Sequence, residues 1–299
     1  MRIGFGLPVS GAWAHPDNVA RFAVRAEELG YHSLWTFQRL LVGVDQELDP
    51  GYRSVLDPLV SLAFAAAHTS RIRLGVAVVN LPFVSPAYLA KQAASLDVLS
   101  RGRVDLGLGT GWSPAEFAAT GADPRRRGAR AEEYVAVLRT LWGDDVSEFH
   151  GEFYTVPPAR MAPKPAQRPG PPILLGGSAP AALRRAGRLA DGWVSRSGTD
   201  LARIGEDVAV VREAARRAGR DPAALRVACR GVVRVGTRGP LLSGSYADIR
   251  GDLDGLAAQG VTELFYDLNW DPLVAAPDVD PAAATRRAEE IIEALAPDR

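Results

Sequence analysis

Residues 73–108 read RLGVAVVNLPFVSPAYLAKQAASLDVLSRGRVDLGL, and the pattern of this stretch determines the expected fold. Arg73–Val79 is rich in β-branched residues and predicts a strand. Pro86–Leu99 predicts a helix, because proline in the first turn loses no hydrogen bond that the helix would otherwise make. Arg103–Leu108 predicts the next strand. A strand, a helix and a strand in this order form one unit of a parallel sheet with a right-handed crossover.

The same alternation continues on both sides of this stretch. Further strands are predicted at Ile3–Leu7, Ser33–Phe37, Ile173–Leu175, Gly192–Ser195, Arg226–Val235 and Glu263–Asp267. Further helices are predicted at Asp17–Leu29, Pro58–Ala67, Arg130–Trp142, Ala179–Ala190, Leu201–Gly219, Ser245–Gln259 and Pro281–Leu295. Eight strand–helix pairs in 299 residues favour a closed (β/α)8 TIM barrel over an open doubly wound sheet, because neither half of the chain forms a self-contained nucleotide-binding unit. No Gly/Ser-rich linker divides the chain, so we expect one domain over residues 1–299.

The composition argues against several classes of protein. The chain has 35 Lys and Arg residues, 35 Asp and Glu residues, a formal net charge of +0 and no lysine-rich run, which does not favour nucleic-acid binding. The one cysteine, Cys229, cannot form an internal disulfide and indicates a reducing compartment, so we expect a cytoplasmic protein. No apolar stretch approaches the roughly 18 residues that cross a bilayer, and glycine and proline interrupt the N-terminal segment before a signal peptide could form.

In a barrel of this class the chemistry belongs to the loops that follow the C-terminal ends of the strands. The loop over residues 38–57 is far longer than the usual length of about 2–6 residues and is typical of a lid or binding loop. Two glycine clusters also follow strands, GLGTGW at 107–112 and LGGSAP at 175–180. Glycines admit a ligand close to the backbone, and the N–H groups at a helix N-terminus bind phosphate, with Ser178 as the expected N-cap. Alternatively, the glycines only form tight turns.

Signals for other chemistry are weak. The first glycine cluster departs from the dinucleotide-binding spacing and does not open a clean helix, and the chain has no Walker A sequence. The four histidines are isolated and have no metal-ligand spacing, so we expect no metal site. Cys229 falls within a predicted strand, where a buried, inert thiol is expected. Two phosphate loops without an evident nucleophile indicate that a bound cofactor does the chemistry.

Several segments together carry a family resemblance over about residues 2–270. They are GYHSLW (30–35), RIRLG (71–75), PAYLAK (86–91), LDVLSRGR (96–103), GLGTGW (107–112), PPILLGGS (171–178) and ADGW (190–193). In this order and spacing they resemble the bacterial-luciferase-like flavin and deazaflavin oxidoreductases. The match is most like the branch that uses the deazaflavin coenzyme F420, and FMN-using relatives are close by.

The resemblance implies that the cofactor ring lies over the C-terminal mouth of the barrel. It implies a bulge in the third strand with a cis Ala77–Val78 peptide bond against the ring. It places the phosphate end of the cofactor at the loops after the fourth and fifth strands. The implied cofactor-binding residues are Phe37, Gln38, Ala77, Val78, Asn80, Thr110, Gly111, Trp112, Gly176, Gly177 and Ser178.

One departure from the family bears on the reaction. The F420-dependent sugar and alcohol dehydrogenases carry Asp-His after the second strand, whereas this chain has Phe37, Gln38 and Arg39 there. Gln38 can orient a carbonyl group but cannot be a general base. The expected activity is therefore that of a reductase, which transfers hydride from F420H2 to an activated C=C or C=N bond.

The candidate catalytic residues are Gln38, Arg39 and Glu116. The proton is expected from Arg39, Tyr52, Glu116 or bound water, although Glu116 at a helix start is more often an exposed carboxylate. Tyr52, Arg53 and Arg238 are the candidate substrate-binding residues. The substrate is expected to be a small molecule, and relatives often form homodimers. Two alternatives stay open: an FMN-dependent monooxygenase that uses reduced flavin and O2, and a cofactor-binding protein without turnover.

Overall fold

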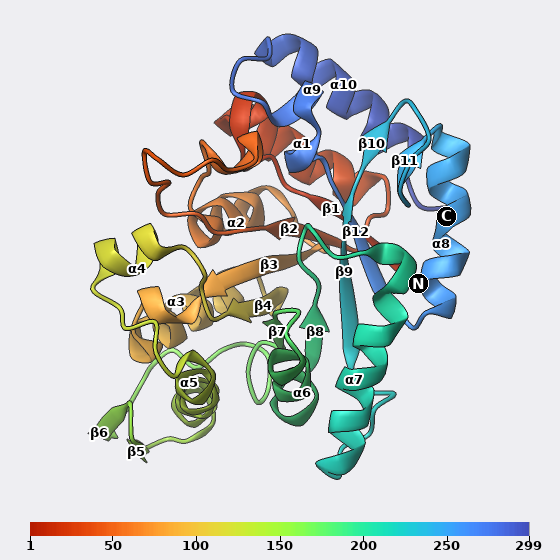
Figure 1. The fold of residues 1–299 in the computed structure, drawn as a ribbon. Helices are drawn as coiled ribbons and strands as arrows, with labels where there is room; N and C mark the ends of the chain where they lie inside the picture. Colours follow the sequence, from red (N-terminus) through yellow and green to blue (C-terminus); the bar gives the residue numbers. More distant parts are fainter. Residues whose placement is uncertain (299) are drawn as a thin grey trace.

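Eight parallel strands close into a barrel in the computed structural model, which describes residues 1–298 (Figure 1). The barrel strands are β1 (Arg2–Gly6), β2 (Ser33–Thr36), β3 (Arg73–Asn80), β4 (Val104–Gly109), β7 (Ile173–Gly176), β8 (Gly192–Val194), β9 (Arg226–Val232) and β12 (Glu263–Asp267). Each pairs with the next barrel strand along the chain, and β12 pairs with β1 to close the ring. The predicted (β/α)8 barrel is therefore confirmed, with all eight predicted strands.

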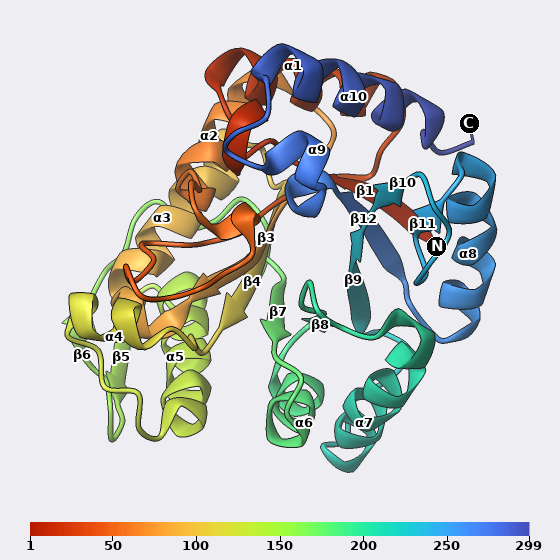
Figure 2. The same ribbon diagram turned by 45° about the horizontal axis from the view of Figure 1, so that its top comes forward.

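Helices surround the barrel (Figure 2). They are α1 (Pro16–Glu28), α2 (Pro58–His68), α3 (Pro86–Leu99), α4 (Pro114–Thr120), α5 (Arg127–Gly143), α6 (Pro180–Leu189), α7 (Ile204–Arg217), α8 (Tyr246–Ala258), α9 (Pro272–Ala275) and α10 (Pro281–Ala294). The 3-10 turns are η1 (Gly11–Trp13), η2 (Pro50–Tyr52), η3 (Leu81–Phe83), η4 (Leu201–Arg203) and η5 (Leu268–Trp270). Asp57, Ser85 and Ser245 begin α2, α3 and α8 by accepting first-turn N–H groups.

Charged side chains close the N-terminal end of the barrel. Asp105 of β4 is fully buried and accepts hydrogen bonds from Arg73 of β3 and Arg226 of β9. Arg226 also donates to Glu263 of β12 at 2.7 Å. Above this network, the rings of Trp35 and Phe265 stack with centroids 4.9 Å apart. The barrel interior is thus filled, and a ligand can enter only from the C-terminal end.

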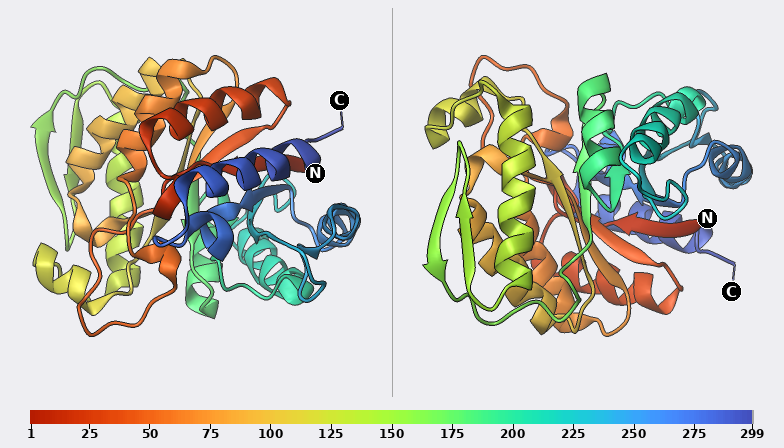
Figure 3. Two further views of the ribbon diagram at one scale, coloured as in Figure 1. Left: turned by 90° about the horizontal axis from the view of Figure 1, so that it is seen from above. Right: turned by 90° about the horizontal axis from the view of Figure 1, so that it is seen from below.

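The structure differs from the sequence-based predictions at three places. The predicted strand Arg226–Val235 is broken, because β10 (Arg234–Val235) leaves the barrel and pairs with β11 (Ser243–Gly244). A hairpin of β5 (Ser147–His150) and β6 (Thr155–Ala159) was missed. It lies outside the ring of helices beside α5 (Figure 3), where prolines in β6 disrupt no barrel pairing. GWSP does open a short helix, α4.

The structure also bears on membrane, metal and thiol chemistry. In the part of the chain that the structure describes, no helix has the length and apolarity to cross a membrane. Among residues 1–298, no three His, Cys, Asp or Glu side chains gather where they could hold a metal ion. Cys229 is buried in β9, and burial raises the pKa of its thiol to about 12. The prediction that the Cys229 thiol is buried is confirmed, and its low reactivity stays a prediction.

Candidate active site

Four aromatic side chains meet at the C-terminal mouth of the barrel. Phe37 follows β2, and its ring centroid lies 4.9 Å from that of Trp270 in η5. Trp270 lies 4.8 Å from Tyr52 of η2, and Tyr52 lies 6.1 Å from Trp112, which follows β4. Phe37 and Trp270 are buried, whereas Trp112 is 48% exposed. We call these four residues the aromatic wall; such a surface suits a planar ligand.

The long loop after β2 is fixed near both of its ends. Near its C-terminal end, Ser10 Oγ donates to the carbonyl of Gly51. Gly51 packs so closely on the aromatic wall that an added Cβ would lie 2.2 Å from a ring carbon of Trp270. Val44, in the middle of the loop, is fully exposed. The loop is therefore held near its C-terminal end, and its centre at Val44 faces solvent.

The anchor at the start of the loop is a buried ion pair. Arg39 Nη1 donates to Glu116 Oε2 of α4 at 2.8 Å, and the Leu40 N–H donates to Glu116 Oε1 at 2.8 Å. The Arg39 and Glu116 side chains are 3% and 1% exposed. Glu116 is therefore not the exposed carboxylate that is more common at a helix start. It can be buried because Arg39 and the Leu40 N–H donate hydrogen bonds to both of its oxygens.

The third strand carries the bulge that the resemblance implies. The Ala77–Val78 peptide bond is cis, and the pairing of β3 with β4 shifts between Val76 and Val79. The side chain of Val78 packs against glycines: a Cβ on Gly109 would lie 2.5 Å from Val78 Cγ2, and one on Gly176 would lie 3.1 Å from Val78 Cγ1. These glycines therefore make room for the bulge at the centre of the mouth.

Gln38 lies beside this bulge. Its Oε1 accepts the N–H of Asn80 at 2.8 Å, which joins the loop after β2 to the end of β3. The structure therefore brings Phe37, Gln38, Ala77, Val78 and Asn80 to one place, as the predicted cofactor site requires.

Arg230 is a site residue that sequence reasoning missed. It is buried in β9, and its Nη2 donates to the carbonyl of Ala77 at the cis bond. Its Nε lies 3.4 Å from Asp267 Oδ2, and its guanidinium carbon lies 5.2 Å from the ring centroid of Phe37. An arginine within the apolar run VACRGVV was the available signal, because a buried cation requires partners.

The two predicted phosphate loops open onto the same mouth. Gly177 has a φ of +124°, a backbone conformation that favours glycine, and its carbonyl accepts the indole N–H of Trp193 at 2.8 Å. Gly111 has a φ of +69°, and its carbonyl accepts from Arg127 Nη1 at 2.6 Å. Ser178 is exposed and is not the N-cap of α6. Ala179 holds that position, and its methyl group accepts no hydrogen bond, whereas its carbonyl accepts the Ala182 N–H at 2.8 Å.

The candidate substrate residues separate into two groups. Tyr52 belongs to the aromatic wall, and Arg53 is exposed beside it in the same loop. Arg238, in contrast, donates to both oxygens of Asp252 in α8, at 2.8 and 2.7 Å. These hydrogen bonds hold the pKa of Asp252 below its ordinary value. Arg238 thus fastens the β10–β11 segment to α8.

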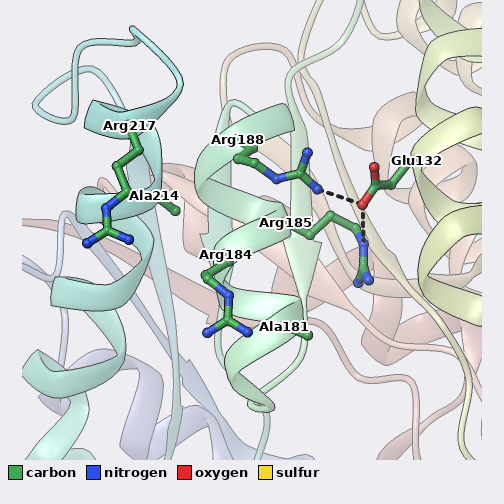
Figure 4. A pocket seen from close by; sticks show the side chains of 7 residues that line it. All are labelled: Glu132, Ala181, Arg184, Arg185, Arg188, Ala214 and Arg217. Carbon is green, nitrogen blue, oxygen red and sulfur yellow. Dashed lines mark hydrogen bonds and ion pairs between the residues drawn. The ribbon is translucent and has the colours of Figure 1, made fainter.

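A hollow of about 270 Å³ lies between helices outside the barrel (Figure 4). It is lined by Glu132, Ala181, Arg184, Arg185, Arg188, Ala214 and Arg217. Arg188 donates to Glu132 at 2.6 Å, and this pair ties α6 to α5. None of the predicted site residues lines this hollow, whereas the aromatic wall and the β3 bulge lie at the mouth of the barrel, which we take as the candidate active site.

Comparisons with known proteins agree with this geometry. A family model described as luciferase-like monooxygenase matches residues 3–239. An uncharacterised protein of Mycobacterium tuberculosis is 44% identical over 143 residues, which are 48% of this chain and 49% of that protein. The F420-dependent glucose-6-phosphate dehydrogenase of Kineococcus radiotolerans is 34% identical over 203 residues, 66% of this chain and 57% of that protein. The chain thus spans about half the length of the curated relatives it matches.

Solved structures share the fold. A monooxygenase of Streptomyces bottropensis has a TM-score of 0.79 and 23% identity, and the match covers 98% of both chains. An F420-dependent secondary alcohol dehydrogenase, solved with an F420–acetone adduct, has a TM-score of 0.77 and 18% identity, again over 98% of both chains.

Proposed function

Because the chain belongs to the luciferase-like monooxygenase family, we propose that it is an F420-dependent oxidoreductase that reduces an activated C=C or C=N bond of a small organic substrate. The observation that carries this proposal is the bulge of β3 between Val76 and Val79, which packs between Gly109 and Gly176 at the strand ends that lead into the two predicted phosphate loops. Relatives that are named F420-dependent glucose-6-phosphate dehydrogenases support the choice of cofactor.

The residues present fit such a cofactor. A planar ring system would lie over Val78, where glycine at 109 and 176 keeps side chains away from the mouth. The phosphate end would bind the N–H groups of Gly177 and Ser178, with the segment Thr110–Trp112 on the other side. Bound F420H2 would supply the hydride.

The chain's own residues then bind, orient and exclude water. Gln38 has no proton to exchange near neutral pH, and Glu116 is already paired with Arg39. We propose bound water as the proton source in preference to Tyr52, whose ring packs against Arg39 and Trp270, and we assign positioning to Gln38 and Arg39. The aromatic wall excludes bulk water from the reacting carbon.

Titration of the purified protein with F420 and with FMN tests the cofactor, with binding followed by cofactor fluorescence. We expect saturable binding of F420, and FMN binding at least tenfold weaker. Anaerobic F420H2 oxidation is then measured with a panel of enones, imines and aldehydes. Binding of FMN without binding of F420 would overturn the proposal.

The description of the family as luciferase-like monooxygenases supports a second candidate function, that of an FMN-dependent monooxygenase. That activity predicts substrate-dependent O2 consumption with reduced FMN, which an F420-dependent reductase does not show. A protein that binds F420 and oxidises F420H2 with no member of the panel would instead be a binding protein without turnover. The homodimer stays a prediction, which light scattering of the purified protein can test.

A further inference from the structure

The guanidinium group of Arg39 is enclosed by aromatic rings but only partly hydrogen bonded. Its central carbon lies 4.6 Å from the ring centroid of Tyr52 and 4.5 Å from that of Trp112. The planes of these two rings meet at 67°, so they form a corner around the cation. Contacts of this kind hold a guanidinium group in one orientation.

Only one nitrogen of this group has a partner in the described chain. Nη1 donates to Glu116, whereas no hydrogen bond among residues 1–298 uses Nε or Nη2. Nε is buried, and a buried donor without a partner is unfavourable unless something else accepts its hydrogen. Nε and Nη2 together form an edge of the guanidinium that can hold one or two oxygen atoms.

Glu116 holds this edge in place without using it. Its second oxygen accepts the Leu40 N–H, so the carboxylate has partners on both sides. Burying the positive charge of Arg39 without a partner would be unfavourable, and the ion pair with Glu116 offsets this cost. Arg39 therefore combines a fixed position, a positive charge and two donors, Nε and Nη2, that no residue of the described chain accepts.

We propose that the Nε–Nη2 edge of Arg39 binds the carbonyl or carboxylate oxygen of the substrate, so that the substrate class is α,β-unsaturated carbonyl compounds. This inference rests on the proposed function, because it assumes that F420H2 reduces the C=C bond of the bound substrate. Trp112, which contacts the guanidinium and is 48% exposed, offers a flat aromatic surface for a conjugated molecule beside the arginine.

The step balances with the proposed cofactor. The β-carbon of the substrate receives hydride from F420H2, and the electrons of the C=C bond move onto the carbonyl oxygen as an enolate. Arg39 stabilises this negative charge, which is larger in the transition state than in the substrate. Water protonates the α-carbon and restores the carbonyl bond. The water becomes hydroxide, and the proton that F420H2 releases when it loses hydride neutralises this hydroxide, so the products are the saturated carbonyl compound and oxidised F420.

Binding of trans-cinnamate, measured by calorimetry with and without F420, tests the inference. We expect Arg39→Gln to weaken binding at least tenfold, because it removes the charge and the donor edge. Arg39→Lys, which keeps the charge but not the paired donors, should lie in between. Arg21→Gln, at an exposed arginine of α1 paired with Glu289, is the matched control and should bind as the parent protein does.

Glu116→Gln separates ligand binding from a purely structural role. If Arg39 binds the anion, Glu116→Gln, which keeps the cation and an amide oxygen that can accept from it, should weaken cinnamate binding clearly less than Arg39→Gln does. If the pair only anchors the loop, Glu116→Gln and Arg39→Gln should weaken binding alike, and that result would overturn the inference. Absence of cinnamate binding at 10 mM, or equal binding by Arg39→Gln, would also overturn it. Thermal melting shows whether each variant folds, and Arg39→Lys gives the answer if Arg39→Gln does not.

Failure of the inference and failure of the proposed function give different results. Arg39-dependent cinnamate binding without F420 binding would refute the cofactor but keep the anion site. F420H2 oxidation with imines, unaffected by Arg39→Gln, would keep the reductase and refute the carbonyl contact. With both correct, Arg39→Gln should lower kcat for enones more than for imines.

Discussion

Replacing Asp105 by asparagine should destabilise the barrel strongly. Four hydrogen bonds from Arg73 and Arg226 reach this fully buried carboxylate. Asparagine removes the negative charge, so the guanidinium groups of Arg73 and Arg226 lose the carboxylate with which they are paired. Breaking a buried ion pair by removing one partner costs about 3–5 kcal/mol. A chain of 299 residues has an unfolding entropy of about 0.6 kcal/mol/K, so Tm should fall by about 5–8 °C.

Thermal unfolding followed by circular dichroism at pH 7 measures this change. Glu206→Gln is the control, because Glu206 and its partner Arg203 are 65% and 68% exposed and their pair should contribute little. A loss of less than 2 °C for Asp105→Asn would refute the reasoning.

The pH dependence gives a second check on the same residue. Burial raises the pKa of Asp105, but hydrogen bonds from Arg73 and the charge of Arg226 outweigh this effect and hold the pKa below its ordinary value. A lowered pKa stabilises the fold above the ordinary aspartate value of about 3.9, and this stabilisation is lost as the pH falls through the folded-state pKa. The difference in Tm between the two proteins should therefore shrink below about pH 4.

Three further predictions concern the mouth and the thiol. Gly177→Asp should weaken F420 binding at least tenfold beyond Gly177→Ala, because both variants strain the backbone but only aspartate repels phosphate; equal losses in a fluorescence titration would contradict the phosphate assignment. Trp193→Phe removes the donor to the Gly177 carbonyl, worth about 1 kcal/mol, so F420 affinity should fall by no more than about fivefold. Cys229 should resist a thiol-specific reagent at pH 8 and react fully in denaturant; rapid labelling of the native protein would contradict its burial.

The barrel was predictable because each strand–helix unit repeats a local pattern of apolar residues and caps. Contacts between residues far apart in the sequence could not be predicted in this way. Glu116 is buried only because Arg39, 77 positions earlier in the chain, reaches it. Arg230 acquires its role from Ala77 on another strand, 153 positions away. The serine at 178 matched the N-cap pattern, but α6 begins one residue later than that pattern predicts. Local sequence therefore places the loops at the mouth, and only tertiary contacts decide which side chains face it.

The two anchors of the loop after β2 have an evolutionary consequence. Arg39 is held by Glu116 and Gly51 by Ser10, so the residues between them can change while the barrel and its bulge stay intact. Lengthening an exposed loop costs little, since closure entropy grows only slowly with length. We expect relatives with different substrate ranges to diverge most between residues 41 and 49, which makes this segment the natural target for a library that redirects the enzyme.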